Sequence, residues 1–441
     1  MSPDAADDYQ ASAPFEGPEK LLEIWFAPSA ADVPALDNAC EHKTGLRTVS
    51  RQTWEDMLDI VKCKVLSVIE GTEMDAYLLR SVVSLPIIIL STLISFSESS
   101  FFVSPHRLIL KTCGTTLNLL GLPRILEIAA QEAKLSTVYR FFYSRKSFMF
   151  PERQLGPHRD WKQEVEYLDQ IFANGSAYTV GKVNGDHWLL YLTSADGYST
   201  TIPPHTQVEP EDRHIDYTIE ILMSDLSPKA REPFFFLDPV DEGDSVTSSS
   251  QAGDISEKLG ITNIFPPTLT HLDAYAFQPC GYSSNALIKW GHDSLEHDFG
   301  CSSVTGNGQP GAHHSGEGYY TIHVTPEEGW SYASFECNVP LSSKISHDGK
   351  IPDLMALIKR VVNIFEPGRI TLTLFISSEH NDTGDETAIE AAQRAFKVAL
   401  TESPIALRQT QKNGVRMYKR TDKINYEFGG YDLAFASFEL K

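Results

Sequence analysis

The sequence predicts an α+β fold, and three observations support that prediction. Many runs rich in Val, Ile, Leu, Phe and Tyr are bounded by Gly, Pro, Asn, Asp or Ser, which is typical of β-strands. About five other segments carry apolar residues at helical spacing, so helices interleave with the strands. No internal repeat with a fixed period is present in the sequence.

Apolar residues three or four positions apart predict the helices. The predicted helices cover residues 54–61, 119–130, 161–172, 354–365 and 387–400. Pro123 lies in the first turn of the second helix, where proline is tolerated. Pro367 and Gly368 follow the fourth helix and separate it from a strand.

Runs of β-branched, aromatic and other apolar residues predict the strands. The predicted strands cover two runs between residues 97 and 116, and residues 64–70, 178–183, 187–193, 217–223, 234–237, 370–376, 415–418 and 431–438. The turn residues Asn184, Gly185 and Asp186 join two of these strands as a hairpin.

Polar and small residues dominate the remaining segments. Residues 1–13 are expected to form a disordered tail, and residues 27–45 and 241–256 are expected to form loops. Residues 292–316, rich in Gly, His and Ser, are expected to form a mobile insertion.

The composition excludes several classes of protein. A formal charge of −22 leaves no basic stripe for a nucleic acid, although it is compatible with a cationic substrate. The start of the chain lacks the basic and apolar regions of a signal peptide. The six cysteines are scattered without a C-x-x-C pair, which favours reduced thiols over zinc or a disulfide framework. We therefore expect a cytoplasmic protein that binds no metal, nucleic acid or membrane.

The most unusual stretch covers residues 97–116. Glu98 precedes Ser99 at the start of the first β-rich run, and Lys111 and Cys113 end the second run before a Gly-Thr-Thr turn. A serine and a cysteine at strand ends can reach a common cleft. Taken alone, the pattern favours an ordinary hairpin with a buried structural cysteine, because free Cys is among the most buried residue types.

Five further segments change that interpretation when they are considered together with Glu98-Ser99-Ser100. They are FEGPEKLLE from Phe15, LKTCGTT from Leu110, FFYSRK from Phe141, PCGYS from Pro279 and YTIHVTPE from Tyr320. In this order the six segments resemble eukaryotic S-adenosylmethionine decarboxylase, the pyruvoyl enzyme of polyamine synthesis. The resemblance extends from about residue 15 to about residue 438 and is highly specific.

The resemblance implies a fold and a processing event. The fold is a four-layer α/β/β/α sandwich of two large antiparallel sheets, formed by one domain over residues 14–441. The chain is expected to cut itself between Glu98 and Ser99 into a β chain, 1–98, and an α chain, 99–441. Ser99 would become the covalent pyruvoyl cofactor, which would hold S-adenosylmethionine as a Schiff base.

The resemblance also implies the catalytic roles. Ser99 attacks the Glu98 carbonyl, His323 removes the Ser99 α-proton, and Ser283 supports processing by a hydrogen bond. Cys113 donates the proton that returns to the substrate carbon. Without the resemblance, His323 would be interpreted as a half-buried strand histidine and Ser283 as a turn residue.

Residues for the substrate follow from the same motifs. Phe15 and Phe277 match the aromatics that sandwich adenine, and Glu327 matches the carboxylate that binds the ribose hydroxyls. Glu16 and Glu19 match acids needed near the active site. Any one of these residues in isolation fits core packing or a solvated face better than a binding site.

A second acidic set matches the buried putrescine site of the animal-type enzymes. The set consists of Glu23, Lys111, Asp216, Thr218, Glu220 and Glu336. Buried carboxylates repel one another unless a cation lies among them, which favours putrescine as an activator. The alternative is that Asp216 and Glu220 simply line an exposed strand. Animal-type relatives further suggest a dimer of processed units.

Residues 80–96 depart from the family pattern, which passes almost directly from a segment like 77–79 to one like 97–99. The run is too short for a membrane span of about 20 residues, and Pro86 interrupts it. It is either an intron retained in the gene model or a lineage-specific insertion.

Three functions compete at this point. The leading one is a self-processing decarboxylase that supplies decarboxylated S-adenosylmethionine for spermidine and spermine synthesis. The second is a non-catalytic paralogue that regulates an active partner, and the third is a cysteine hydrolase that uses Cys113 and His323. Only the first predicts two chains divided between Glu98 and Ser99.

Overall fold

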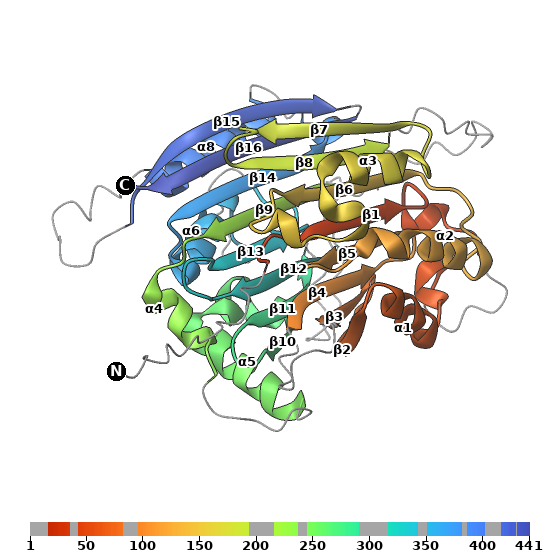
Figure 1. Ribbon diagram of the computed structural model, residues 1–441, viewed down its shortest axis with the longest axis horizontal. Helices are drawn as coiled ribbons and strands as arrows, with labels where there is room; N and C mark the ends of the chain where they lie inside the picture. The colour runs from red at the N-terminus through yellow and green to blue at the C-terminus, as the bar shows by residue number, and fades with distance from the viewer. Residues whose placement is uncertain are drawn as a thin grey trace, which may run out of the picture.

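Two antiparallel sheets of eight strands each form the centre of the molecule. The computed structural model describes residues 16–35, 43–82, 96–193, 216–236, 245–290, 316–342, 351–381, 386–401, 416–428 and 430–441. The first sheet, sheet A, has the strand order β2-β3-β4-β5-β1-β6-β8-β7. The second, sheet B, has the order β10-β11-β12-β13-β9-β14-β16-β15. Figure 1 shows that the two sheets lie one behind the other.

The chain builds sheet A before sheet B. Sheet A contains β1 Lys20–Trp25, β2 Cys63–Glu70, β3 Asp75–Val82, β4 Phe96–Val103, β5 Arg107–Thr112, β6 Arg140–Lys146, β7 Gly175–Gly181 and β8 His187–Thr193. Sheet B contains β9 Tyr217–Ser224, β10 Thr270–Ala276, β11 Tyr282–Trp290, β12 Gly316–Thr325, β13 Tyr332–Cys337, β14 Arg369–Ser377, β15 Tyr418–Phe428 and β16 Tyr431–Leu440.

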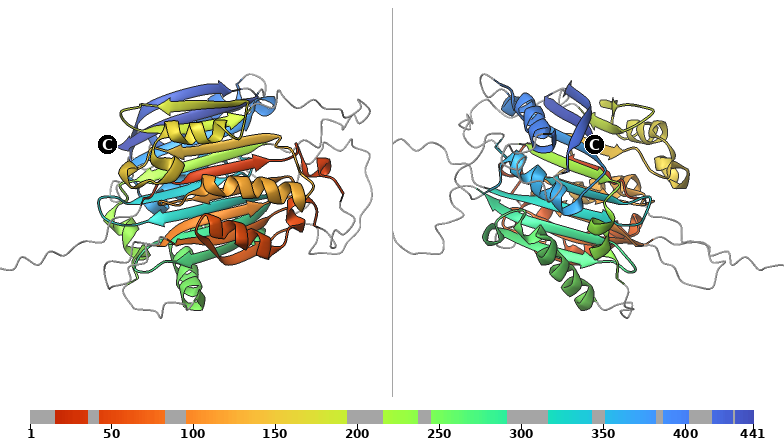
Figure 2. Two further views of the ribbon diagram at one scale, coloured as in Figure 1. Left: turned by 45° about the vertical axis from the view of Figure 1, so that its right-hand side comes forward. Right: turned by 90° about the vertical axis from the view of Figure 1, so that its left-hand side faces the viewer.

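Helices cover the outer face of each sheet, as the turned views in Figure 2 show. The helices α1 Arg51–Ile60, α2 Leu122–Gln131 and α3 Trp161–Asp169 pack with sheet A in one apolar cluster. The helices α5 Ser245–Leu259, α6 Leu354–Phe365 and α8 Ala388–Thr401 pack with sheet B in another. Two single-turn helices, α4 Pro228–Arg231 and α7 Ser378–Asn381, complete the set. The predicted four-layer α/β/β/α sandwich is therefore confirmed.

The space between the sheets holds two apolar clusters and a polar band. One cluster joins Trp25 and Trp188 of sheet A to Phe435 of sheet B, and the other joins Phe102 to Tyr319. Buried polar and charged side chains lie between them, and this polar band contains Glu19, Glu23, Ser100, Lys111, Glu220, Asn285, Thr321, His323, Ser334, Glu336 and Thr373. Burial of so many polar groups is costly unless they pair, so the band is the place to look for function.

The strand β1 shows how the sequence produces this band. Its side chains alternate between the two faces of sheet A, because successive residues of a strand point to opposite sides. Leu22 and Ile24 enter the apolar layer beneath α1 and α2. Glu23 lies between the sheets, and Glu19 reaches the same interior from the residue just before the strand.

Two predicted elements are wrong. Residues 234–236, the described part of the strand predicted at 234–237, form no strand, because Phe234 ends a 3₁₀ turn and Phe235 makes a single bridge to Cys280. The loop predicted at 241–256 is wrong for residues 245–256, which belong to α5, and residues 241–244 lie outside the described part of the chain. In that helix Ser256 donates its hydroxyl to the Ala252 carbonyl oxygen, so a Ser-rich sequence satisfies its own polar groups.

Other predictions differ in position or concern residues outside the described ranges. The strand predicted at 415–418 overlaps the observed strand only at Tyr418, because β15 continues to Phe428 through charged residues that interrupt the apolar pattern at this sheet edge. The tail at 1–13 lies outside the described residues, and the expected insertion at 292–316 does too except for Gly316.

The run at 80–96 extends a hairpin at both of its ends. Arg80, Ser81 and Val82 continue β3, and Phe96 begins β4. The pairing Leu79 with Ser99 is followed by Arg80 with Glu98 and Ser81 with Ser97. The bond between Glu98 and Ser99 therefore lies inside a β-ladder, while residues 83–95 are outside the described part of the chain.

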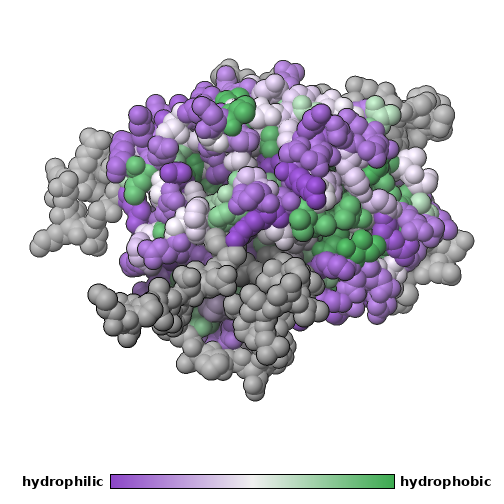
Figure 3. Space-filling model, in the orientation of Figure 1, coloured by the Kyte–Doolittle hydropathy of each residue, from purple (hydrophilic) through white to green (hydrophobic). Residues whose placement is uncertain are grey.

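The surface of the sheet A side is mostly hydrophilic, with apolar groups gathered near α2 (Figure 3). No helix among the described residues is long and apolar enough to cross a membrane.

Candidate active site

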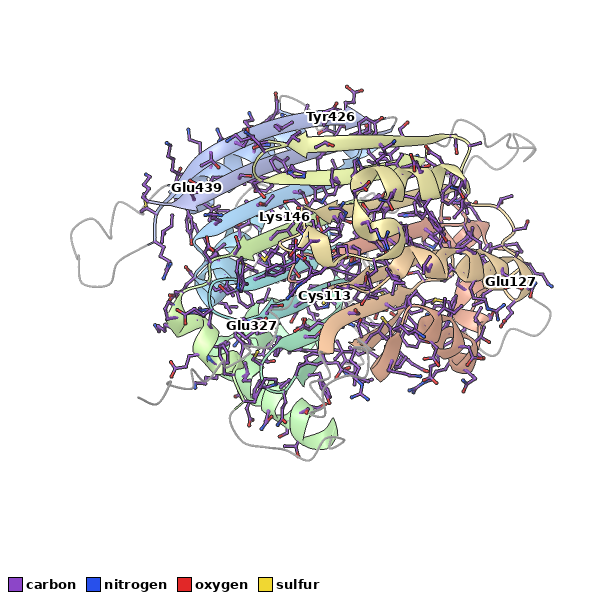
Figure 4. All side chains as sticks on the ribbon, viewed as in Figure 1. Cys113, Glu127, Lys146, Glu327, Tyr426 and Glu439 are labelled. Carbon is purple, nitrogen blue, oxygen red and sulfur yellow. The ribbon has the colours of Figure 1, made fainter. Side chains whose placement is uncertain are left out.

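The candidate active site lies where β4 and β5 of sheet A face β11, β12 and β13 of sheet B. Cys113 directly follows β5, and Glu327 comes shortly after β12 (Figure 4). In this region β3 and β4 of sheet A contact β11 of sheet B, and β4 also contacts β12. Residues more than 180 positions apart therefore meet around the Glu98–Ser99 bond.

A thiol contacts the carbonyl that the sequence marks for cleavage. Cys113 donates its Sγ–H to the Glu98 carbonyl oxygen, with an S···O distance of 2.6 Å. Glu98 is itself buried, and burial raises the pKa of its carboxyl to about 8. Gly281 has a φ of +122°, and a Cβ there would lie 2.7 Å from Glu98 Oε1. Glycine at this position therefore leaves room for the Glu98 side chain.

The hydroxyl of Ser99 faces away from sheet B. Its Oγ lies 3.0 Å from Ser81 Oγ, and Ser81 Oγ lies 3.3 Å from Cys63 Sγ. All three side chains are buried. Ser81 belongs to the run at 80–96, so a residue outside the family pattern contacts the predicted nucleophile.

His323 and Glu19 form a buried pair in the polar band. His323 Nδ1 lies 3.1 Å from Glu19 Oε1, and its Nε2 lies 2.9 Å from Ser100 Oγ. Burial lowers the pKa of His323, and the hydrogen bond with Glu19 offsets only part of that effect. The imidazole is therefore neutral near pH 7, as a general base must be.

Glu19 stays ionised although it is buried. Burial alone would raise its pKa, but the charge of Lys111 and the hydrogen bond with His323 lower it to about 2. Tyr332 and Ser334 also donate their hydroxyls to this carboxylate. An ionised Glu19 fixes the proton of His323 on Nδ1, which leaves a lone pair on Nε2.

Ser283 lies next to His323 and is fully buried. The two residues are directly opposite in the ladder between β11 and β12. The Ser283 hydroxyl has no hydrogen-bond partner among the described residues. A buried hydroxyl without a partner is costly, and it suits a site where a new polar group forms during a reaction.

The other acid of the first motif, Glu16, holds a loop rather than the histidine. Its carboxylate accepts the backbone N–H groups of Met149 and Phe150 at 2.7 and 2.8 Å. Its carbonyl oxygen accepts the N–H of Gly114 at 3.2 Å. Lys20 donates to the Gly114 carbonyl at 2.7 Å, so the turn that carries Cys113 is fixed on both sides.

The predicted substrate residues are only partly assembled. Phe277 is buried, with its ring centroid 5.0 Å from that of Tyr275, and Glu327 is half-buried. Phe15 lies outside the described residues. The expected pair of aromatic rings around adenine therefore stays a prediction.

The second acidic set surrounds a separate pocket in the polar band. Glu23, Asp216 and Glu220 line this pocket with Leu21, Phe142, Thr218 and Phe375. Glu220 is only 6% exposed, so the alternative of an exposed strand is wrong for this residue. Asp216 is half-buried and accepts a hydrogen bond from Tyr431 at 2.5 Å.

Lys111 links the acidic pocket to the histidine pair. Its Nζ lies 2.7 Å from Glu336 and 3.8 Å from Glu220, which are directly opposite each other in sheet B. Burial lowers the pKa of Lys111, but Glu336, Glu19 and Glu220 outweigh that effect and raise it. The charge of this one ammonium group therefore lowers the pKa of Glu19 on one side and of Glu220, at the pocket, on the other.

Among the described residues that line this pocket, three are acidic and none is Lys or Arg. Burial raises the pKa of Glu23 to about 7, with the Asp216 carboxylate adding to the shift and Arg107 opposing it. Burial also raises the pKa of Glu220 to about 7, although Lys111 opposes it. A bound cation would favour the ionised form of these carboxyls, so the pocket is suited to binding one.

Sequence reasoning missed several polar neighbours of His323. Ser100 and Thr321 contact its Nε2, and Asn285 contacts Ser100, but only Thr321 lies near His323 in the sequence. Alternation along β4 was the available signal for Ser100, because its side chain must face opposite to that of Ser99. In the described part of the chain, no group of three or more His, Cys, Asp or Glu side chains could hold a metal ion.

Comparisons with known proteins agree on one family. The sequence model of the adenosylmethionine decarboxylase family matches residues 12–439. An S-adenosylmethionine decarboxylase proenzyme of Xenopus laevis is 33% identical, with 96% of this chain and 95% of the relative covered. The proenzyme of Saccharomyces cerevisiae is 32% identical, with 97% and 93% covered, and that of Drosophila melanogaster is 34% identical, with 96% and 95% covered.

A solved structure is also similar in part. It is the crystal structure of a Trypanosoma brucei AdoMetDC-delta26 monomer, with 19% sequence identity and a TM-score of 0.45. The match covers 77% of this chain and 99% of the other.

Proposed function

The chain belongs to the adenosylmethionine decarboxylase family, and from this premise we propose that it is a proenzyme that cuts itself and then decarboxylates S-adenosylmethionine. The observation that carries the proposal is the 2.6 Å contact between the Cys113 thiol and the Glu98 carbonyl oxygen. This contact joins a proton donor to the bond that the family motif marks for cleavage.

The first step of self-cleavage is attack of the Ser99 hydroxyl on the Glu98 carbonyl carbon. As the ester C–O bond forms, the amide C–N bond breaks and the hydroxyl proton passes to the released Ser99 amine. Negative charge develops on the carbonyl oxygen in the transition state. A donor aimed at that oxygen lowers the barrier, and Cys113 is placed to do so. The unpartnered Ser283 hydroxyl is a second candidate donor for the same step.

The second step is elimination, for which His323 is the base. Its Nε2 accepts the Ser99 α-proton, the Cα–H electron pair becomes a Cα=Cβ bond, and Glu98 leaves as a carboxylate. Glu19 stabilises the resulting imidazolium, because its ionised carboxylate faces Nδ1 at 3.1 Å. Water then converts the dehydroalanine to pyruvate and releases ammonia.

The pyruvoyl group formed from Ser99 would supply an electron sink for loss of the substrate carboxylate. The residues around Ser99 fit such a group, since they exclude water and place a thiol next to it. Cys113 holds a proton for the carbon that loses CO2. Phe15 and Phe277 are proposed to bind adenine, and Glu327 the ribose.

Putrescine is the proposed activator of this enzyme. The pocket lined by Glu23, Asp216 and Glu220 joins acidic groups to the apolar side chains that would contact a four-carbon chain. Lys111 connects the pocket to Glu19, and through it to His323. A cation in the pocket would therefore change the field at the base.

The cytoplasm is the proposed cellular setting. The four described cysteines are free, which suits the reducing cytoplasm. A dimer of processed units is proposed from the resemblance to animal-type enzymes.

Intact mass spectrometry of the purified chain tests the function. We expect two polypeptides that divide between Glu98 and Ser99, with pyruvoyl at the start of the second, and CO2 release from S-adenosylmethionine. Ser99→Ala should stay one chain, because it lacks the attacking oxygen. A wild-type chain that stays whole, folded and inactive would favour the non-catalytic alternative, which no observation here supports.

A further inference from the structure

One buried hydroxyl in the polar band contacts three polar groups at once. Ser100 Oγ lies 2.7 Å from Asn285 Oδ1, 2.9 Å from His323 Nε2 and 3.1 Å from Thr321 Oγ1. Ser100, Asn285 and Thr321 are 0% exposed, and His323 is 2% exposed. Without water to exchange partners, the direction of each hydrogen bond matters for the chemistry.

The orientation of the Asn285 amide is fixed from behind. Its Nδ2 donates to the Tyr77 carbonyl oxygen of β3 at 3.0 Å. A reversed amide would turn its own oxygen toward that carbonyl oxygen, and two acceptors would face each other. Oδ1 therefore faces Ser100, and it can only accept the Ser100 proton.

His323 Nε2 competes for the same proton. Because Glu19 is ionised, the neutral imidazole carries its proton on Nδ1 and offers a lone pair at Nε2. The Ser100 hydroxyl has one proton and three possible acceptors, of which Asn285 Oδ1 and His323 Nε2 are closer than Thr321 Oγ1. Donation to Nε2 would occupy the lone pair that the base needs.

We propose that Asn285 acts through Ser100 to keep the His323 Nε2 lone pair available, which makes Asn285 and Ser100 positioning residues for self-cleavage. The shorter contact, 2.7 against 2.9 Å, favours donation to Asn285. This inference rests on the proposed function, because it concerns the elimination step at Ser99.

After proton transfer to His323, the new N–H group and the Ser100 O–H group each have a hydrogen-bond acceptor. When the Ser99 α-proton moves to Nε2, the imidazolium N–H needs an acceptor, and Ser100 Oγ provides it at 2.9 Å. Ser100 continues to donate to Asn285, so each proton has an acceptor. Interactions that are stronger after the transfer than before it accelerate the step.

Removal of Asn285 should reverse this preference. In Asn285→Ala the Ser100 proton has only His323 Nε2 and Thr321 as acceptors, so the base is occupied before the reaction. The ester should still form, because that step uses Ser99 and the Glu98 carbonyl. Elimination should slow by about tenfold or more, the usual effect of losing a hydrogen bond to a charged group.

Hydroxylamine trapping separates the two steps. Hydroxylamine attacks the ester at Glu98 and releases an α chain that begins with serine, whereas elimination gives an α chain that begins with pyruvoyl. For Asn285→Ala we expect fast release of the serine form in hydroxylamine and slow formation of the pyruvoyl form without it. Intact mass spectrometry measures both rates.

A double-mutant cycle tests whether Asn285 acts through Ser100. In a Ser100→Ala background, Asn285→Ala should change the elimination rate by less than about twofold, because the link is already absent. Independent, additive effects of the two substitutions would overturn the proposal. So would Asn285→Ala forming the pyruvoyl chain at the wild-type rate.

Two further variants control for loss of a buried polar group. Ser284→Ala removes the neighbouring hydroxyl of β11, which is equally buried, and it should eliminate at the wild-type rate. Asn285→Asp keeps an acceptor for Ser100, and burial favours a protonated carboxyl whose O–H replaces Nδ2 as donor to the Tyr77 carbonyl, so it should eliminate faster than Asn285→Ala. If Asn285→Ala fails to fold, Asn285→Asp decides, because an Asp variant that stops at the ester contradicts the proposal. A wild-type chain that never cleaves would refute the proposed function instead.

Discussion

Ser99 and Ser100 are neighbours in the chain, but alternation along β4 directs their hydroxyls to opposite faces of sheet A. Ser99 contacts Ser81 on the helix-covered face, and Ser100 contacts Asn285 of sheet B. Glu98, on the same face as Ser100, places its carbonyl against the Cys113 thiol. A shift of one residue in register would exchange these environments and separate the thiol from its carbonyl.

The role of the thiol gives a prediction at this scale. Cys113→Ala should slow self-cleavage by about tenfold, because the Glu98 carbonyl loses its donor, and should slow decarboxylation by about a hundredfold. Cys113→Ser keeps a hydroxyl donor and should cleave faster than Cys113→Ala. Mass spectrometry measures cleavage, and CO2 release from the processed protein measures decarboxylation. Full-rate turnover by Cys113→Ala would remove the thiol from the mechanism.

Individual elements show which parts of the structure the sequence reveals. The helix α6 was predicted to the residue, because Leu357, Val361 and Phe365 recur at helical spacing and are all buried. The helix α5 was missed because its few apolar residues that pack inward, Ala252, Ile255 and Leu259, stand among many serines, so tertiary contacts and not composition stabilise it. The positions of Cys113 and His323 follow from motifs, but Asn285 carries no motif signal. The role of Asn285 depends on its contact with Ser100 across the two sheets, and a local sequence pattern cannot predict such a contact.

The hairpin of β3 and β4 gives a prediction for an element. Leu79 lies directly opposite Ser99, so deletion of residues 80–96 would leave only Ser97 and Glu98 to make the turn. Two residues are the commonest hairpin connection. We therefore expect the shortened chain to fold and to cleave at least as fast as the full chain. The Glu98–Ser99 bond would then lie at the turn and no longer between paired residues of β3 and β4.

Thermal unfolding and intact mass of the shortened chain measure this outcome. A matched control deletes only residues 83–95, which keeps the extended ladder. An unfolded or uncleaved shortened chain, beside a cleaved control, would mean that Arg80 and Ser81 are required in the hairpin.

At the scale of the whole molecule, the polar band is the feature that distinguishes this sandwich from an ordinary one. Two apolar clusters hold the sheets together on either side of it. The band crosses from the acidic pocket at Glu23 through Lys111 to His323. Apolar packing on both sides excludes solvent from the band. A charge added in the acidic pocket therefore changes the electrostatic potential at His323 with little screening by water.

Diamine binding should depend on pH across this band. Glu23 and Glu220 have pKa values of about 7, raised above the 4.5 of an ordinary glutamate. In the folded chain they are mainly protonated below pH 6 and ionised above pH 8, whereas in the unfolded chain they already ionise near pH 4.5. The free energy of unfolding therefore falls as pH rises from about 4.5 to about 7, and the full penalty of ionised, buried carboxylates is present at pH 8. A dication reverses this penalty, so putrescine should raise the unfolding midpoint more at pH 8 than at pH 6.

Thermal unfolding and decarboxylation across putrescine concentrations test the diamine site. Asp216→Val should weaken both responses at pH 8, whereas Glu427→Gln, an exposed acid on β15, should leave them unchanged. Coupling of this kind is typically about 5- to 150-fold in affinity. A wild-type protein that ignores putrescine at both pH values would make the acidic pocket purely structural.

The strand order of sheet A determines what a cut after Glu98 would leave behind. The strand β1 belongs to the first 98 residues, yet it lies between β5 and β6, which belong to the remainder. The two polypeptides are therefore interleaved, and they could separate only if the sheet opened through its middle. A partner made elsewhere could not replace either one without unfolding the molecule. Each protein would keep for its lifetime the two pieces with which it was translated, always in equal number, and removing one would mean destroying both.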